Sequence, residues 1–263
     1  MADVYTMGID IGSTASKCLI LKNGTDISGY AVIGAGTGTS GPKRSVEQAL
    51  SNAGITINEI SGITATGYGR NTFSEADWIV SELSCHAIGI HAVFPDVRTL
   101  IDIGGQDAKA IRVSTTGKLE NFVMNDKCAA GTGRFLDVMA RVLELDVSEL
   151  AERDAMAENV VNISSTCTVF AESEVISQLS NNVNICDLVA GIHRSVAVRT
   201  AGLAKRLGIV EPVAMSGGVA LNSGAARALE RELGIPVRIP PLPQINGAYG
   251  AAIYAWEHRK QER

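Results

Sequence analysis

The sequence predicts an α/β protein made of two duplicated lobes. Stretches with strand character alternate with helical stretches along most of the 263 residues, which is typical of α/β folds. A strand that ends in Asp-Ile-Gly occurs twice, at Asp10 and at Asp102, and a hairpin follows each copy. Such self-similarity indicates a duplication. Hydrophobic residues make up 46% of the chain and charged residues 19%, so each half can bury a core.

The first lobe is expected over residues 1–95. Its opening strand carries the first Asp-Ile-Gly, and Asn23-Gly24 is a typical two-residue hairpin turn. The predicted elements of this lobe are strands 4–11, 17–21 and 27–33, a helix over 43–52, a strand over 60–66 and a helix over 77–94.

The second lobe is expected over residues 96–246, with Thr116-Gly117 as its hairpin turn. Because strands alternate with helices, we expect mainly parallel sheets. The C-terminal helix, about residues 247–263, is expected to pack back on the first lobe and to end in a solvated charged tail. The predicted elements of this half are strands 98–103, 108–113, 119–124, 212–216 and 236–240, and helices 131–144, 170–180, 186–207, 221–233 and 247–259.

Charge and hydropathy exclude several classes of partner. The 23 Lys and Arg against 28 Asp and Glu give a net charge of −5. This argues against nucleic acid, because phosphate backbones need a concentrated positive surface. No apolar run approaches the roughly 20 residues of a membrane span, and the first residues lack the pattern of a secretory signal peptide. We therefore expect a cytoplasmic protein whose five cysteines stay reduced.

The two Asp-Ile-Gly elements suit a metal-bound nucleotide. A tight turn between hairpin strands exposes backbone N–H groups that bind anions. Asp10 and Asp102 are suited to hold Mg²⁺ through its waters, and Gln106 is suited to orient an attacking water. For one copy alone a plain β-turn is the alternative, and the duplication argues against it. The predicted catalytic residues are Asp10, Asp102 and Gln106, and the predicted phosphate-binding residues are Gly12, Ser13, Thr14, Ala15, Ser16, Lys17, Gly104, Gly105 and Gln106.

A third glycine element runs from Met215 to Asn222, where a strand closes and a helix opens. Glycines at such a place let a flat base or a ribose approach the backbone closely. Gly217, Gly218 and Asn222 are therefore predicted to contact the adenosine part of a nucleotide. An ordinary glycine-rich turn is the alternative.

These three elements, in this order, resemble the motifs of the actin, sugar-kinase and heat-shock-chaperone ATPase superfamily. Residues 10–17 are similar to its first phosphate motif, 102–109 to the second and 215–222 to the adenosine motif. The resemblance covers nearly the whole chain. It implies two ribonuclease-H-like lobes with a nucleotide cleft between them, and phosphoryl transfer as the reaction class.

Two cysteines lie in segments that lead into predicted helices. Cys128 precedes Ala-Ala-Gly-Thr-Gly, and Cys167 precedes the helix over 170–180. We expect both thiols at helix N-termini, where the thiolate is favoured. Iron–sulfur and zinc sites usually need four ligands, so two copies of the chain related by a two-fold axis would complete a [4Fe–4S] site. The alternative is that both thiols are buried and inert, as free cysteines often are.

The sequences around these cysteines resemble those of one family. Residues 125–136 (Asn-Asp-Lys-Cys-Ala-Ala-Gly-Thr-Gly-Arg-Phe-Leu) and 164–175 (Ser-Ser-Thr-Cys-Thr-Val-Phe-Ala-Glu-Ser-Glu-Val) are similar to those of the ATP-dependent activators of 2-hydroxyacyl-CoA dehydratases, their iron–sulfur component A. These activators are related to the ATPase subunits of benzoyl-CoA reductase. The segments 8–17 and 81–87 carry the same resemblance.

The resemblance implies a homodimeric iron–sulfur ATPase of an anaerobe, in which Cys128 and Cys167 of two subunits hold one [4Fe–4S] cluster. Such a protein accepts an electron from ferredoxin or flavodoxin. Hydrolysis of ATP, bound with Mg²⁺, drives that electron into the dehydratase. There it starts the radical removal of water from a 2-hydroxyacyl-CoA, a step of amino-acid fermentation.

Two other functions are open to this fold. A small-molecule kinase needs a carboxylate general base, a role for which Glu172 or Glu174 could be recruited. An assembly protein of the actin type would use nucleotide only to control polymerisation, and it gives no reason for thiols at two helix starts. We interpret Cys18 as a core residue, Cys85 as a packed or interface thiol, and Cys186 as an unassigned residue at the start of a helix.

Overall fold

The computed structural model describes residues 3–164 and 167–259, which form two compact units. Compared with the lobes expected over 1–95 and 96–246, the hairpin segment Val113–Glu120 and the short stretches 96–97 and 244–246 group with the first unit instead of the second. The end of the predicted charged tail, residues 260–263, lies outside the described residues. Unit 1 takes in the described parts of Met1–Val97, Val113–Glu120 and Gln244–Arg263, and unit 2 those of Arg98–Arg112 and Asn121–Pro243.

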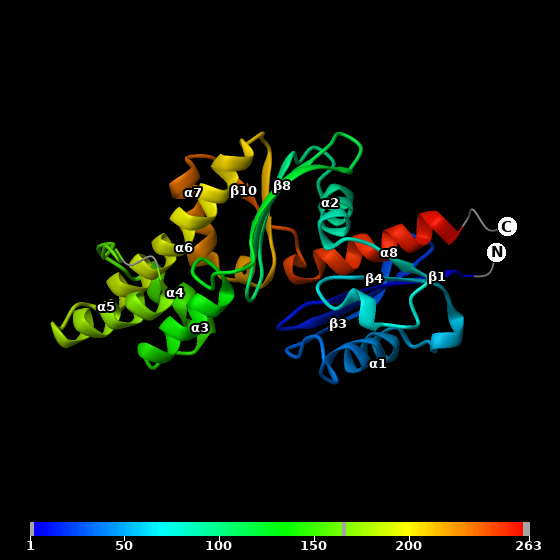
Figure 1. Cartoon of the computed structure of the whole chain (residues 1–263), viewed down its shortest axis with the longest axis horizontal. Coiled ribbons are helices and arrows are strands. Elements are labelled where there is room, and N and C mark those ends of the chain that lie inside the picture. Colours follow the sequence, from blue (N-terminus) through cyan, green and yellow to red (C-terminus); the bar gives the residue numbers. More distant parts are fainter. Residues whose placement is uncertain (1–2, 165–166, 260–263) are drawn as a thin grey trace. The chain divides into compact units, whose positions relative to one another are not determined.

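Unit 1 is built on a five-stranded sheet with the strand order β3-β2-β1-β4-β5. The central strand β1 pairs antiparallel with β2 and parallel with β4. The elements are β1 (Tyr5–Ile11), β2 (Ser16–Lys22), β3 (Asp26–Ile33), α1 (Gly41–Ala53), β4 (Ile60–Thr66), β5 (Trp78–Ile79), α2 (Glu82–Val93) and α8 (Asn246–His258) (Figure 1).

Helices cover both faces of this sheet. Met7 shares a buried cluster with Ala49 of α1, whereas the neighbouring Thr6 donates a hydrogen bond from Oγ1 to the carbonyl of Ala252 in α8 (3.1 Å). Successive side chains of a strand point to opposite faces, so α1 and α8 lie on opposite sides of β1. The last helix thus packs on the first strand, as expected for the C-terminal helix (Figure 1).

The helix predicted over 77–94 begins later than expected. Asp77 is tied to β4, because its carboxylate accepts a hydrogen bond from the N–H of Ile63 (2.8 Å) and its own N–H donates to the carbonyl of Ile63. The next residues form the short strand β5, and Ser81 then caps α2 by accepting from the N–H of Ser84. A contact with a distant strand therefore overrides the helical spacing of this segment.

The second sheet has the strand order β10-β9-β6-β7-β8. Read from the hairpin side, this is the topology of the first sheet, which confirms the duplication. The prediction of mainly parallel sheets is wrong: both sheets are mixed, because each hairpin contributes antiparallel pairs. The elements are β6 (Thr99–Ile103), β7 (Ala108–Val113), β8 (Leu119–Asn125), α3 (Gly133–Val142), α4 (Leu150–Ala155), α5 (Thr168–Ser180), α6 (Ile185–Leu207), β9 (Val213–Ser216), α7 (Ser223–Leu233) and β10 (Val237–Arg238).

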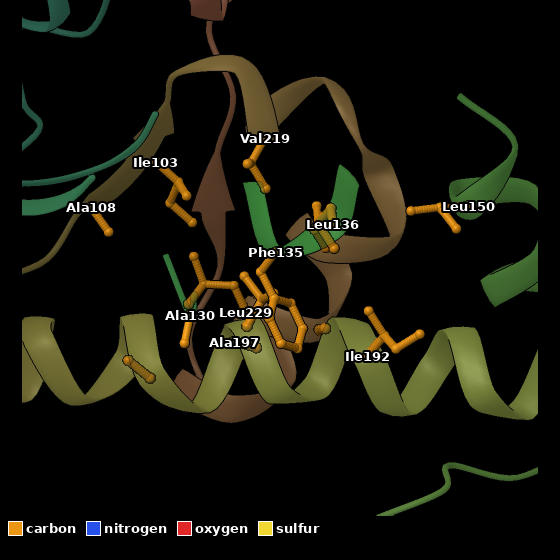
Figure 2. Packing of buried hydrophobic residues seen from close by; sticks show 14 of the residues in the cluster. Ile103, Ala108, Ala130, Phe135, Leu136, Leu150, Ile192, Ala197, Val219 and Leu229 are labelled. Atoms are coloured by element: carbon orange, nitrogen blue, oxygen red, sulfur yellow. The ribbon is translucent and has the colours of Figure 1, made fainter. Parts of the chain in front are cut away.

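The core of unit 2 gathers around α6. Phe135 of α3 is completely buried and belongs to one cluster with Ile192 and Ala197 of α6 and Leu229 of α7 (Figure 2). Side chains four residues apart share a face of a helix, so the core position of Phe135 also directs Met139 inward. In the described part of the chain, no helix combines the length and apolarity needed to span a membrane.

Candidate functional site

The first predicted phosphate motif is a tight turn between β1 and β2. Asp10 faces Lys17 across the antiparallel ladder, and Lys17 Nζ lies 3.1 Å from Asp10 Oδ2. The N–H of Gly12 donates to the carbonyl of Ala15 (3.0 Å) and closes the turn. Ser13 and Thr14 stand exposed at its tip. The turn therefore presents two hydroxyls beside a lysine that keeps partial contact with solvent.

Ser16 differs from the other hydroxyl residues of this motif. It is fully buried at the start of β2, and its Oγ donates to the carbonyl of Ala35 (2.8 Å). Its hydroxyl is used inside the protein, so the surface hydroxyls of the motif reduce to Ser13 and Thr14.

The second predicted phosphate motif repeats the Asp–Lys pairing between β6 and β7. Lys109 Nζ lies 3.4 Å from Asp102 Oδ2 and 2.6 Å from an oxygen of Asp107. The N–H of Gly104 donates to the carbonyl of Asp107 (2.9 Å), as Gly12 does to Ala15 in the first turn. Gln106 is exposed at the tip. Asp107 was not predicted from the sequence, although it occupies the position of Ala15 in the repeat.

The second turn is also tied to neighbouring elements of unit 2. Ser216, at the end of β9, donates from Oγ to Asp102 Oδ1 (2.6 Å). The start of α3 is hydrogen-bonded to the turn. The N–H of Gly133 donates to the carbonyl of Gly104 (2.9 Å), and the N–H of Arg134 donates to the carbonyl of Gly105 (2.8 Å). Both glycine carbonyls therefore hold the helix that follows the Cys128 segment.

The third predicted element follows β9 directly. Gly217 has φ of 89°, and Gly218 is exposed at the start of a short 3₁₀ turn. Asn222 is nearly buried and caps α7, its Oδ1 accepting from the N–H of Ala225 (3.1 Å). The helix predicted from residue 221 thus begins at Ser223.

Asn222 also belongs to a buried polar network that was not predicted from the sequence. Its Nδ2 lies 3.0 Å from His193 Nε2, and His193 Nδ1 lies 3.1 Å from Asp154 Oδ1. Because Asn222 presents N–H to Nε2, the imidazole proton resides on Nδ1 and points to Asp154. Burial acts to raise the pKa of Asp154, but the hydrogen bonds from His193 and Arg227 outweigh it and hold the pKa below its ordinary value. The network links α4, α6 and the start of α7, which follows the turn of Gly217 and Gly218.

The five cysteines divide by exposure. Cys128 and Cys167 are exposed, Cys186 is partly exposed at the start of α6, and Cys18 and Cys85 are completely buried. Burial raises the pKa of the Cys85 thiol to about 12 and also raises that of Cys18. The two thiols predicted to be ligands are thus the two most accessible, and the interpretation of Cys18 and Cys85 as packed residues is confirmed.

Cys167 takes the N-cap position of α5, as predicted, whereas residues 165–166 before it lie outside the described residues. The prediction that Cys128 lies at a helix N-terminus is wrong. Thr132 is the N-cap of α3, and Cys128 lies four residues earlier in a loop, where Asn125 Nδ2 donates to its carbonyl (2.9 Å). Gly131 has φ of 84°, a left-handed conformation that stops the helix from extending back to Cys128.

One of the two carboxylates named for a kinase, Glu174, is engaged in a structural contact. Glu174 accepts hydrogen bonds from both the N–H and the Oγ of Ser164, each at 3.0 Å. This contact fixes Ser164 to α5.

Two sheets of equal topology, each with an Asp–turn–Lys element, define the ATPase class that includes actin and the sugar kinases. A ROK family glucokinase from Streptomyces griseus has this fold, with a TM-score of 0.58 at 14% identity over 96% of this chain and 99% of that one. The chain belongs to the BadF/BadG/BcrA/BcrD ATPase family, whose model matches residues 7–255. The resemblance inferred from the motifs is therefore confirmed.

Similar proteins span the same length. The chain is 55% identical over 260 residues to the 2-hydroxyisocaproyl-CoA dehydratase activator of Clostridioides difficile, covering 99% of this chain and 98% of that one. It is 58% identical over 255 residues to the (R)-2-hydroxyglutaryl-CoA dehydratase activating ATPase of Acidaminococcus fermentans, covering 97% and 98%. A solved structure of the former activator with bound ADPNP matches with a TM-score of 0.96 at 56% identity, over 98% of this chain and 96% of that one.

Proposed function

We propose that this protein is an ATP-hydrolysing activator of a 2-hydroxyacyl-CoA dehydratase, to which it passes a single low-potential electron. Near full-length identity to proteins named as dehydratase activators supports the partner and the use of ATP. The observation that carries the electron-transfer role is the exposure of Cys128 and Cys167 in a chain whose Cys18 and Cys85 are buried. The proposed site of action is the cytoplasm of an anaerobe, where thiols stay reduced.

The thiols fit half of a cluster site. In the described ranges 3–164 and 167–259, no three His, Cys, Asp or Glu side chains are grouped so that they could hold a metal. A [4Fe–4S] cluster usually takes four thiolates, so Cys128 and Cys167 from each of two copies would hold one cluster in a homodimer. When bound, the cluster supplies a one-electron carrier. Ferredoxin or flavodoxin is the proposed donor.

The nucleotide roles follow from the differences between the turns. The proposed phosphate contacts are Lys17, the hydroxyls of Ser13 and Thr14, and the N–H groups of the first turn. The proposed adenosine contact is the turn of Gly217 and Gly218. Gln106, exposed in the second turn, is proposed to orient the attacking water.

The carboxylates fit a hydrated magnesium ion better than a directly bound one. Both oxygens of Asp102 already have partners, since Lys109 and Ser216 contact them. Mg²⁺ commonly keeps several of its waters in nucleotide sites. Asp10 and Asp102 are therefore proposed to hold Mg²⁺ through water.

Purification under strict exclusion of oxygen tests the cluster. We expect about four iron and four sulfide per dimer, the composition of a [4Fe–4S] cluster. Cys167→Ala and Cys128→Ala should each abolish the cluster, whereas Cys186→Ala, at a partly exposed cysteine outside the proposed set, should retain it. An iron-free wild-type protein after reconstitution would refute the proposal, and a full cluster in Cys167→Ala would refute the ligand assignment.

The dimer and the electron transfer are tested separately. Light scattering should give a dimer for the cluster-loaded protein. Mixed with ATP, a reductant and a 2-hydroxyacyl-CoA dehydratase, the protein should start dehydration, and ADPNP in place of ATP should not support it. Phosphorylation of a small hydroxyl compound in place of this activity would favour the kinase alternative.

A further inference from the structure

We propose that Thr132 is a positioning residue that couples the second phosphate turn to the loop of Cys128. The inference rests on the proposed function and deepens it, because it names the contact through which nucleotide at Gly104–Gln106 would affect a cluster ligand. All residues involved belong to unit 2.

The hydroxyl of Thr132 has two acceptors and one proton. Its Oγ1 lies 2.6 Å from the carbonyl oxygen of Ala129, next to Cys128, and 3.2 Å from the carbonyl oxygen of Gly105, in the phosphate turn. Thr132 is completely buried, so water does not compete for this proton. A hydroxyl donates a single hydrogen. The donor is therefore shared by the two loops, and a gain at one acceptor is a loss at the other.

Neither carbonyl depends on this hydroxyl alone. The Ala129 carbonyl also accepts from the N–H of Thr132 (3.1 Å), and the Gly105 carbonyl also accepts from the N–H of Arg134 (2.8 Å). The side chain of Thr132 makes no capping hydrogen bond to α3. Removing the hydroxyl thus leaves both carbonyls with a hydrogen-bond donor and the start of α3 intact. A variant without the hydroxyl is therefore expected to fold.

The neighbouring contacts make the position of the Cys128 loop depend on the position of the second phosphate turn. The N–H of Gly133 binds the carbonyl of Gly104, so the first residue of α3 moves with the phosphate turn. On the other side of Cys128, Asn125 holds the Cys128 carbonyl. A shift of the turn toward bound phosphates would strengthen the contact of the Thr132 hydroxyl with Gly105 and weaken its contact with Ala129. The segment that follows Cys128 would then keep only the backbone hydrogen bond from Thr132 and become looser.

The test compares Thr132→Val, which has nearly the same shape without the donor, with Thr132→Ser, which keeps the donor. The extended backbone of Thr132 (φ −124°, ψ 175°) suits valine. In the full-length, cluster-free protein, the rate at which N-ethylmaleimide modifies Cys128 is measured with and without Mg²⁺-ADPNP. Peptide mass spectrometry reads Cys167 and Cys186 in the same sample as internal controls.

We expect ADPNP to change the Cys128 rate about fivefold in the wild type and in Thr132→Ser, the size expected for one hydrogen bond. In Thr132→Val the change should fall below about twofold, with ADPNP affinity retained. In the cluster-loaded dimer, the same contrast should appear in the nucleotide dependence of iron release to a chelator.

Two results would overturn the coupling role: a full nucleotide effect at Cys128 in Thr132→Val, or no nucleotide effect in a wild-type protein that binds ADPNP. A wild-type protein that fails to bind ADPNP would instead overturn the proposed function. If Thr132→Val proves unfolded by circular dichroism, the comparison of Thr132→Ser with Thr132→Ala decides the point in the same assay, since alanine also removes the donor.

Discussion

The two phosphate turns have the same backbone plan and different side-chain chemistry. In the first turn, Lys17 faces one carboxylate and is 19% exposed; in the second, Lys109 faces two carboxylates and is 4% exposed. The first turn carries exposed hydroxyls at its tip, and the second carries Gln106.

This difference indicates that the copies have specialised. A lysine that keeps contact with solvent is free to turn toward phosphate, whereas one enclosed by Asp102 and Asp107 mainly orders those carboxylates. The first turn is therefore expected to bind phosphates, and the second to organise metal-bound water and the attacking water. Substitutions at equivalent positions can break this division of roles.

The largest difference is expected in the loss of stability when each of the two lysines is replaced. Lys109→Met leaves the buried Asp102 carboxylate without its cation and beside Asp107, at a cost of roughly 3–5 kcal/mol in the free energy of unfolding. Lys17→Met also removes the cation of a buried carboxylate, that of Asp10, but water reaches the partly exposed Lys17 side, so the cost should be smaller, about 1–3 kcal/mol. Urea denaturation measures both. Equal losses would show that the two turns hold their lysines alike.

The second largest effect is expected on turnover. Gln106→Ala should lower kcat for ATP hydrolysis about 100-fold, because the attacking water loses its orienting partner, while the Kd for ADPNP stays within about twofold. Thr14→Ala, at the equivalent position of the first turn, is the matched control and should leave kcat nearly unchanged. If kcat falls equally in both variants, the specialisation is refuted.

An intermediate effect is expected on nucleotide affinity. Lys17→Met should raise KM for ATP about tenfold with little change in kcat, since it removes a charge that binds substrate and transition state alike. Isothermal titration with ADPNP provides the check. An unaltered affinity would remove Lys17 from the phosphate contacts.

The smallest effect distinguishes two serines of the first turn. Ser16→Ala should lower the free energy of unfolding by about 1 kcal/mol, because its buried hydrogen bond to Ala35 is lost, and should leave ADPNP affinity unchanged. Ser13→Ala should do the reverse, with a loss of affinity of a few fold. Loss of nucleotide binding in Ser16→Ala would show that the buried hydroxyl reaches the ligand.

The duplicated sheet and its two Asp-Ile-Gly turns were predictable because their contacts are local, whereas the Asp–Lys pair within each turn was not predicted. Asp10 and Lys17, or Asp102 and Lys109, are seven residues apart, so a hairpin brings each pair together. The exposure of Cys128 and Cys167 was also consistent with their motifs.

The features that escaped prediction depend on distant parts of the chain. In the sequence, Ser16 cannot be distinguished from the exposed hydroxyl residues Ser13 and Thr14. Its hydroxyl is buried because β2 pairs with β3, which brings the carbonyl of Ala35 within hydrogen-bond distance. His193 shows no ligand spacing, since Asp154 and Asn222 reach it from two other helices. Likewise, no periodicity marks the late start of α3, which Gly131 determines by its backbone conformation.

The docking of α8 on β1 has a consequence for biosynthesis. Thr6 bonds to Ala252, 246 residues later, whereas every residue of unit 2 lies between 98 and 243. A chain emerging from the ribosome can therefore complete unit 2 first, although domains usually fold in order from the N-terminus. Unit 1 is complete only after its last helix, α8, has been synthesised. A nascent or truncated chain can therefore contain a folded Gln106 turn while β1, which carries Asp10, still lacks the helix that packs on it.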